Sequence, residues 1–212
     1  MWNQKIIDCI KNKIPFSQKK LFKNKLTSWK EVEQLINCRP FVSNSRFRIP
    51  PGYSYNWRKE EWLTDVNTYP ASVINKIIKK HWFFLIDCSR INKKINSVCN
   101  YLETITGMPT DAHIFISNKP DKNFDNKSFG KHKDKQDNLI VSVEGSQKMT
   151  IYKKDNPTEI EIEKTFKPGD AIFIPAGRFH KIAGLEKRMS VSFPMVPNLI
   201  YPKQERKWIT LD

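Results

Sequence analysis

Apolar residues follow two different periods along this chain. Up to about residue 110 they recur at steps of three and four, the spacing of one helix face, and beyond it they alternate with polar residues, as in half-buried strands. Helices therefore come first and strands second. Since eight short strands joined by close turns are typical of a jelly roll or barrel, we expect a mainly β fold, a jelly roll with flanking N-terminal helices.

Two helices are well marked in the first part of the chain. One is predicted over 29–36, where Ser28 and the glutamate three residues later can form a capping box. The other is predicted over 90–106, with Ser89 as its N-cap and Gly107 at its end. Both helices have an apolar face.

Weaker patterns occupy the rest of the first part. We expect residues 1–25 to form a strand or a short helix that packs on the edge of the domain. A short helix is predicted at 71–80 and a short buried strand at 82–86. The aromatic-rich stretch 40–70 predicts an irregular connection that packs over a sheet face, with a substrate-facing flap as the alternative.

The second part predicts a succession of strands, at about 112–117, 130–132, 138–143, 148–153, 159–165, 171–174, 180–183 and 189–193. Turn sequences such as Glu144-Gly145-Ser146 and Lys167-Pro168-Gly169-Asp170 separate many of them. We therefore divide the chain into a helical or irregular support region at 1–109, a β core at 110–196 and a tail at 197–212, all within one structural domain.

Composition agrees with a globular protein that is not embedded in a membrane. Hydrophobic residues make up 39% of the chain, which is enough for a core. No apolar run is long enough to span a bilayer, and the N-terminus lacks the apolar region of a secretory signal. The four cysteines are scattered without a Cys-x-x-Cys pair, so we expect reduced thiols and a cytoplasmic protein.

The net charge of +15 comes mostly from lysine. A lysine-, asparagine- and isoleucine-rich composition also follows from an AT-rich coding sequence, and the basic residues are interspersed with acidic ones. A nucleic-acid partner is therefore possible but not favoured over a solvated basic surface. The sequence does not indicate an oligomeric state.

Three residues have the order of a non-haem iron ligand set. His132 and Asp134 are one residue apart, so they would share one face of a strand, and His180 follows 46 residues later. Two imidazoles and a carboxylate on one side of a metal leave positions open for substrate and oxygen. The alternative is a surface His132 and a His180 that caps a turn.

The sequence around these residues carries a family resemblance. Phe129–Tyr152, FGKHKDKQDNLIVSVEGSQKMTIY, closely resembles the core of the JmjC and cupin-like 2-oxoglutarate oxygenases. Lys167–His180, KPGDAIFIPAGRFH, resembles the Pro-Gly-Asp and Pro-x-Gly-x-x-His segment of the same families. The resemblance covers about residues 110–195, with both blocks in the right order.

This resemblance implies a double-stranded β-helix, a cupin-like jelly roll, with Fe(II) bound by His132, Asp134 and His180. 2-Oxoglutarate and O2 would be the cosubstrates, and 2-oxoglutarate would be decarboxylated to succinate while a substrate C–H bond is oxidised. The iron would supply the redox chemistry, and the protein would supply position and shielding.

The far carboxylate of 2-oxoglutarate needs a buried cation, and two residues compete for this role. JmjC-like hydroxylases generally use a lysine two residues beyond the hairpin glycine, but here Lys148 is three beyond Gly145. Many other 2-oxoglutarate oxygenases use an Arg-x-Ser pair, which Arg188 and Ser190 match. We favour Arg188 narrowly, because Lys148 faces inward only if the turn is lengthened by one residue. The alternative for Arg188 and Ser190 is an outward, solvated face, with Met189, Val191 and Phe193 packed inside.

Other polar residues receive weaker assignments. The resemblance implies that Asn138 borders the cosubstrate, and that Ser117 does so as well, whereas His81 and His113 are interpreted as structural.

Three functions are compatible with these patterns. The first is a dioxygenase that hydroxylates a protein side chain, with a ribosomal or translation-factor residue among the options. The second is an oxygenase that acts on a small molecule or a nucleobase. The third is a metal-binding cupin without oxygenase activity, which the candidate cation at Arg188 or Lys148 argues against.

Overall fold

The computed structural model describes residues 2–37, 47–48, 82–117 and 130–197 of the chain. The helix predicted at 71–80 and nearly all of the stretch 40–70 lie outside the described residues.

Three helices and ten strands are found in the described part. The helices are α1 (Gln4–Lys11), α2 (Trp29–Asn37) and α4 (Lys93–Thr106). The strands are β1 (Phe16–Gln18), β2 (Phe47–Arg48), β3 (Trp82–Leu85), β4 (His113–Ser117), β5 (Asp137–Glu144), β6 (Gln147–Tyr152), β7 (Ile160–Phe166), β8 (Ala171–Ile174), β9 (His180–Gly184) and β10 (Arg188–Met195).

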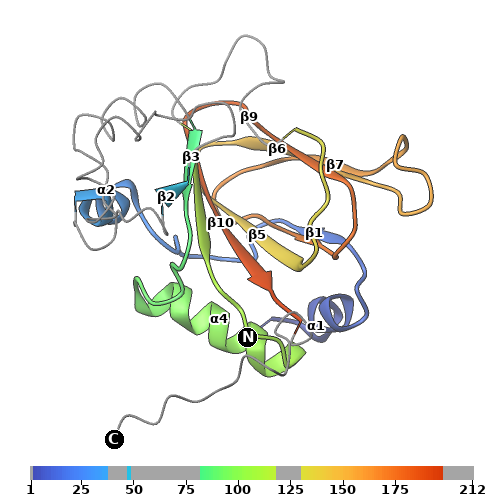
Figure 1. Cartoon of the computed structure of the whole chain (residues 1–212), viewed down its shortest axis with the longest axis horizontal. Helices are drawn as coiled ribbons and strands as arrows, with labels where there is room; N and C mark the ends of the chain where they lie inside the picture. The colour runs from blue at the N-terminus through green and yellow to red at the C-terminus, as the bar shows by residue number, and fades with distance from the viewer. Residues whose placement is uncertain (1, 38–46, 49–81, 118–129, 198–212) are drawn as a thin grey trace, which may run out of the picture.

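The strands form two antiparallel sheets, as expected for a jelly roll. The major sheet has the order β1-β8-β5-β10-β4-β3-β2, and the minor sheet has the order β7-β6-β9. Figure 1 shows the minor sheet on one side of the major sheet, with α1 and α4 on the other side. The prediction of a mainly β fold with flanking helices is confirmed. Three strands of the major sheet, β1 to β3, come from the chain before residue 110.

Each central strand of the major sheet is buried on both faces. On β10, Met189, Val191 and Phe193 belong to the core that the sheet forms with the three helices. Because side chains alternate along a strand, the intervening residues face the minor sheet. A second, smaller core lies between the sheets and consists of Ile140, Met149, Ile151, Phe166, Ile172 and Ile174.

The two predicted helices are present, with one correction. Ser28 and Glu31 form the expected capping contacts, since Glu31 N–H donates to Ser28 Oγ at 3.3 Å. The second helix begins at Lys93, and its N-cap is Asn92, whose side chain accepts from Ile95 N–H at 2.9 Å. The prediction of Ser89 as the cap was therefore wrong.

Two further expectations can be compared with the structure. The strand predicted at 130–132 is not a regular strand, because only a single bridge forms there, between His132 and His180. The N-terminal residues contain both a helix and an edge strand, where the sequence predicted one or the other.

Two further features concern the cysteines and the helices of the described residues. Cys9, Cys88 and Cys99 are free thiols, and Cys38 lies outside the described residues. Among the described helices, none is both long enough and apolar enough to cross a membrane.

Gly145, in the turn between β5 and β6, provides a test of this fold. Its φ is +65°, and a Cβ there would lie 2.1 Å from the backbone oxygen of Lys187. Gly107 has a similar φ of +69° but open space around it. We expect Gly107→Ala to lower the free energy of unfolding by about 1 kcal/mol, the cost of a left-handed backbone. Gly145→Ala should lower it by about 3 kcal/mol or more because it adds a backbone clash.

Urea denaturation of the two variants measures both values. Equal losses of unfolding free energy for Gly145→Ala and Gly107→Ala would contradict the close approach of Gly145 to the backbone of Lys187.

Candidate metal centre

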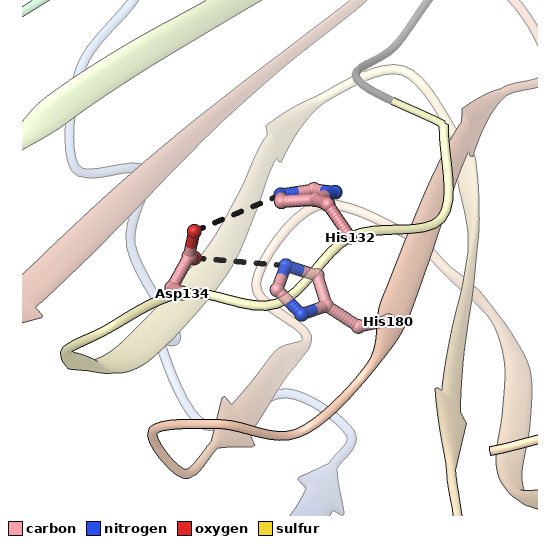
Figure 2. A group of neighbouring side chains, drawn as sticks. All are labelled: His132, Asp134 and His180. Carbon is pink, nitrogen blue, oxygen red and sulfur yellow. Dashed lines mark ion pairs between the residues drawn. The ribbon is translucent and has the colours of Figure 1, made fainter.

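The three predicted metal ligands lie together. His132 and Asp134 are in the loop before β5, and His180 is the first residue of β9. One ligand atom from each residue lies within 4.8 Å of those of the other two. His132 Nε2 is 3.8 Å from Asp134 Oδ1, and His180 Nε2 is 3.7 Å from Asp134 Oδ2. Figure 2 shows both imidazoles directed at the carboxylate.

Backbone carbonyls fix the orientation of both imidazole rings. Nδ1 of His132 is 3.0 Å from the carbonyl oxygen of Gly130, and Nδ1 of His180 is 3.1 Å from that of Arg178. A carbonyl oxygen can only accept a hydrogen bond, so each Nδ1 is the donor of its ring and each Nε2 is the ring nitrogen directed at Asp134. This is the ring orientation in which the Nε2 atoms of two histidines can bind one metal ion.

The two ligand-bearing segments are joined by backbone hydrogen bonds. His132 N–H donates to His180 O at 3.0 Å, and His180 N–H donates to His132 O at 2.8 Å. Gly177 N–H donates to Asp134 O at 2.8 Å. These bonds hold the loop before β5 against the turn before β9, which explains how ligands 46 residues apart in sequence come together.

Further contacts fix the turn that precedes His180. Arg178 donates from Nε and Nη2 to the carbonyl oxygen of Tyr152, at 3.2 and 2.9 Å, and it forms an ion pair with Glu161. Tyr152 N–H in turn donates to Phe179 O at 2.9 Å. The turn is thereby anchored to the minor sheet.

Asp134 is oriented by a chain of two polar residues. Asn138 Nδ2 donates to Asp134 Oδ2 at 2.7 Å, and Ser192 Oγ donates to Asn138 Oδ1 at 3.2 Å. Asn138 therefore contacts the carboxylate of Asp134 directly, and it also lines the cavity described below, so its place beside the cosubstrate stays a prediction. Hydrogen-bond partners of this kind orient a ligand and tune its basicity.

The electrostatic environment keeps His180 neutral. Its side chain is 2% exposed, and burial lowers the pKa of His180; the neighbouring His132 also lowers it, while the Arg178 carbonyl and Asp134 oppose the shift. A metal binds the neutral imidazole, so this shift extends metal binding towards lower pH. Two imidazoles and one carboxylate are a ligand set that suits a divalent transition metal.

A cavity of about 240 Å³ extends from these ligands between the two sheets. Its lining combines polar groups with apolar walls: Phe84, His113, Phe115, Ile116, His132, Asp134, Gln136, Asn138, Ile140, His180, Ile182, Arg188, Ser190 and Ser192. The three predicted metal ligands and Arg188 therefore line one cavity.

Arg188 is a buried cation without an anionic partner among the described residues. Its Nη1 donates to Gln147 Oε1 at 2.6 Å and lies 3.4 Å from Ser190 Oγ, while its Nε has no hydrogen-bond partner. Burial lowers the pKa of Arg188 to about 10, so the guanidinium stays charged at neutral pH. A buried, incompletely bonded charge is costly, and an anion in the cavity would offset this cost.

Gly184 leaves room for the arginine. A Cβ at Gly184 would lie 3.0 Å from Arg188 Nε and 3.2 Å from its Cδ. Because Gly184 has no side chain, the guanidinium of Arg188 can lie against β9 of the minor sheet.

Lys148, the competing cation, lies outside the cavity. It forms an ion pair with Glu163 at 2.7 Å, and 46% of its side chain is exposed. Gln147, two residues beyond Gly145, is fully buried instead. The turn is therefore not lengthened, and strand alternation directs Gln147 inward and Lys148 outward.

The remaining predicted residues divide between the cavity and the core. Ser190 lines the cavity, whereas Ser117 is buried on β4 and is not among the lining residues. His113, interpreted as structural, lines the cavity and lies with its Nε2 3.2 Å from Asp111 Oδ2.

Sequence reasoning missed several residues of this site. Gln147 was given no role, although it stands two residues beyond Gly145, at the position where JmjC-like hydroxylases generally have the lysine. The stacked rings of Phe84 and Phe115, with centroids 5.0 Å apart, form part of the cavity wall. Their pairing depends on the register of β3 against β4, which the sequence does not reveal.

Comparison with known proteins supports the fold. No family model and no curated protein matches the chain. Among solved structures, the crystal structure of Escherichia coli ribosomal oxygenase YcfD is 18% identical, with a TM-score of 0.63 over 93% of this chain and 53% of YcfD. YcfD in complex with cobalt and 2-oxoglutarate is 19% identical, with a TM-score of 0.58 over 87% of this chain and 48% of YcfD.

The chain thus spans about half the length of YcfD. At this level of identity the likeness concerns the fold, and it agrees with the JmjC and cupin-like resemblance of the sequence. The chain has a jelly-roll fold that it shares with the E. coli ribosomal oxygenase YcfD.

Proposed function

We propose that this protein is an Fe(II)- and 2-oxoglutarate-dependent dioxygenase that hydroxylates a protein side chain. The observation that carries the proposal is the pairing of two features in one cavity: a His-Asp-His cluster and a buried arginine without an anionic partner among the described residues. A ligand that joins them needs a metal-chelating end and a carboxylate end, which 2-oxoglutarate has.

His132, Asp134 and His180 would hold the metal. Bound Fe(II) supplies the oxygen activation and redox chemistry of this enzyme class. The chain's own residues keep both Nε2 atoms directed at the metal position, through the carbonyl acceptors of Nδ1. Asn138 holds the Asp134 carboxylate, so we propose that it acts through Asp134.

Arg188 is the proposed partner of the far carboxylate. Gln147 fixes one guanidinium nitrogen, and Nε has no hydrogen-bond partner among the residues that the structure describes, so an anion would complete the hydrogen bonding of the group. Ser190 adds a hydroxyl beside it. Lys148 and Ser117 are left out of the proposed contacts, because neither lines the cavity.

The substrate we propose is a protein side chain. The support is the shared fold with YcfD, which is described as a ribosomal oxygenase. A ribosomal protein or another component of translation is the most direct candidate class, and the cytoplasm is the corresponding location. Oxidation of a peptide side chain by this chemistry adds one oxygen atom.

Turnover of 2-oxoglutarate tests the proposal. Purified protein with Fe(II), ascorbate and ribosomal protein extract should convert 2-oxoglutarate to succinate, and a protein in the extract should gain 16 Da. Asp134→Ala, which removes one of three ligands, should reduce succinate formation at least about 100-fold. If the native protein forms no more succinate than Asp134→Ala, the assignment as an oxygenase is wrong.

The role of Arg188 is tested by replacing it with a side chain of similar length. Arg188→Met should raise the Kd for 2-oxoglutarate at least about 30-fold, because it removes the buried partner of a carboxylate. The free energy of unfolding should stay the same or increase, because an unpaired buried charge is lost. Calorimetric titration with 2-oxoglutarate in the presence of Mn(II) measures the first quantity, and urea denaturation measures the second.

Lys148→Met is the matched control for Arg188→Met. We expect its Kd for 2-oxoglutarate to stay within about twofold of the native value, because an exposed ion pair contributes little. A large loss of affinity in Lys148→Met, with none in Arg188→Met, would reverse the assignment of the two cations.

A further inference from the structure

A buried carboxylate near the metal ligands is paired with a lysine from the N-terminal segment. Asp137, the first residue of β5, has a side chain that is only 3% exposed. Its Oδ2 forms an ion pair with Lys13 Nζ, 124 positions earlier in the chain. Its Oδ1 accepts a hydrogen bond from Ala176 N–H at 2.8 Å.

The bond to Ala176 bears directly on the metal site. Ala176 and Gly177 are neighbours in the turn that leads into His180, and Gly177 N–H donates to Asp134 O at 2.8 Å. The backbone of Asp134 and the side chain of Asp137 thus bind two successive N–H groups of the same turn. Asp137 therefore helps to set the position of His180 relative to the other two ligands.

Lys13 lies just past the end of helix α1. Lys13 follows the C-cap of α1, Asn12, and has a φ of +57°. Glycine is the favoured residue at a left-handed position just past a helix end. Lys13 has a left-handed backbone at this position, and from there its ammonium reaches Asp137.

We propose that Lys13 is a positioning residue of the metal centre. Its ammonium neutralises the buried Asp137 carboxylate, which can then stay in place and hold the turn at Ala176. Without Lys13, the carboxylate would be buried and uncompensated, a state that favours its movement towards water and away from the turn. His180 would then be held less firmly against His132 and Asp134. The inference rests on the metal centre of the proposed function.

The chain contains a matched control for this ion pair. Lys25 pairs with Glu144 at 2.8 Å, and Glu144 is the last residue of β5, at the end away from the metal ligands. The side chains of Lys13 and Lys25 are similarly exposed, at 49% and 54%. Both lysines therefore connect the N-terminal segment to β5, but only Lys13 does so beside the metal site.

The test is the affinity of the purified metal-free protein for Co(II), measured by calorimetric titration. Lys13→Met should raise the Kd about tenfold, a typical effect of removing support behind a metal ligand. Lys25→Met should leave the Kd within about twofold of the native value. Lys13→Met combined with Asp137→Asn should recover most of the affinity, because asparagine can still accept from Ala176 N–H without a buried charge.

Three outcomes would overturn the inference: an unchanged Kd in Lys13→Met, an equal loss in Lys25→Met, or a double variant no better than Lys13→Met. Failure of the native protein to bind Co(II) would instead contradict the metal centre itself.

Thermal unfolding of the metal-free proteins separates weakened metal binding from a general loss of structure. If Lys13→Met does not fold, Asp137→Asn and Asp137→Ala replace it. The asparagine variant should bind Co(II) within about threefold of the native Kd, and the alanine variant, which also loses the bond to Ala176, should bind about tenfold more weakly. Equal affinities of these two variants would overturn the inference.

Discussion

The structure depends on the burial of β10 on both of its faces. Met189, Val191 and Phe193 pack into the core beneath the helices, so alternation directs the polar residues of the strand into the space between the sheets. Arg188, Ser190 and Ser192 are each no more than 5% exposed. A guanidinium cannot be part of a dry apolar core without a large desolvation cost. The space beside Arg188 is accordingly a partly polar cavity. Apolar residues, among them Ile140 of β5 and Ile172 of β8, form the small core elsewhere between the sheets.

The metal end of the cavity follows from a different constraint. Three ligands from two distant segments must converge, and backbone hydrogen bonds between the segments achieve this. His132 pairs with His180 in a single isolated bridge, so the segment around His132 is not part of a regular strand. His180 is almost fully buried, whereas the side chains of His132 and Asp134 are each 30% exposed. Of the three predicted ligands, His180 thus lies on the buried side of the site, and His132 and Asp134 lie on its exposed side.

Much of this arrangement could be predicted from the sequence, because its signals are local. The spacing of apolar residues predicted that helices precede strands. The two segments that resemble the oxygenase families, Phe129–Tyr152 and Lys167–His180, identified His132, Asp134 and His180 as a group. The inward direction of Arg188 was less certain, since alternation allowed either face until the burial of Met189 was known. Lys148 illustrates the same limit, because one residue more in the preceding turn would have reversed its direction.

What could not be predicted depends on contacts between distant parts of the chain. Gln147 and Arg188 are 41 positions apart, and Lys13 and Asp137 are 124 apart. Neither pair has a sequence signature, because the partners meet only once the sheets have formed. The N-cap of α4 is a local error of another kind: Ser89 and Asn92 are both good caps, but the helix begins only at Lys93, so Asn92 is the residue in the capping position.

The central claim is that one ligand joins the metal to Arg188 across the cavity. A crystal structure of the protein with Mn(II) and 2-oxoglutarate, with the metal located by anomalous scattering, tests it most directly. The account predicts the metal on His132, Asp134 and His180, with the far carboxylate of 2-oxoglutarate on Arg188. A metal bound elsewhere, or a carboxylate bound at Lys148, would contradict it.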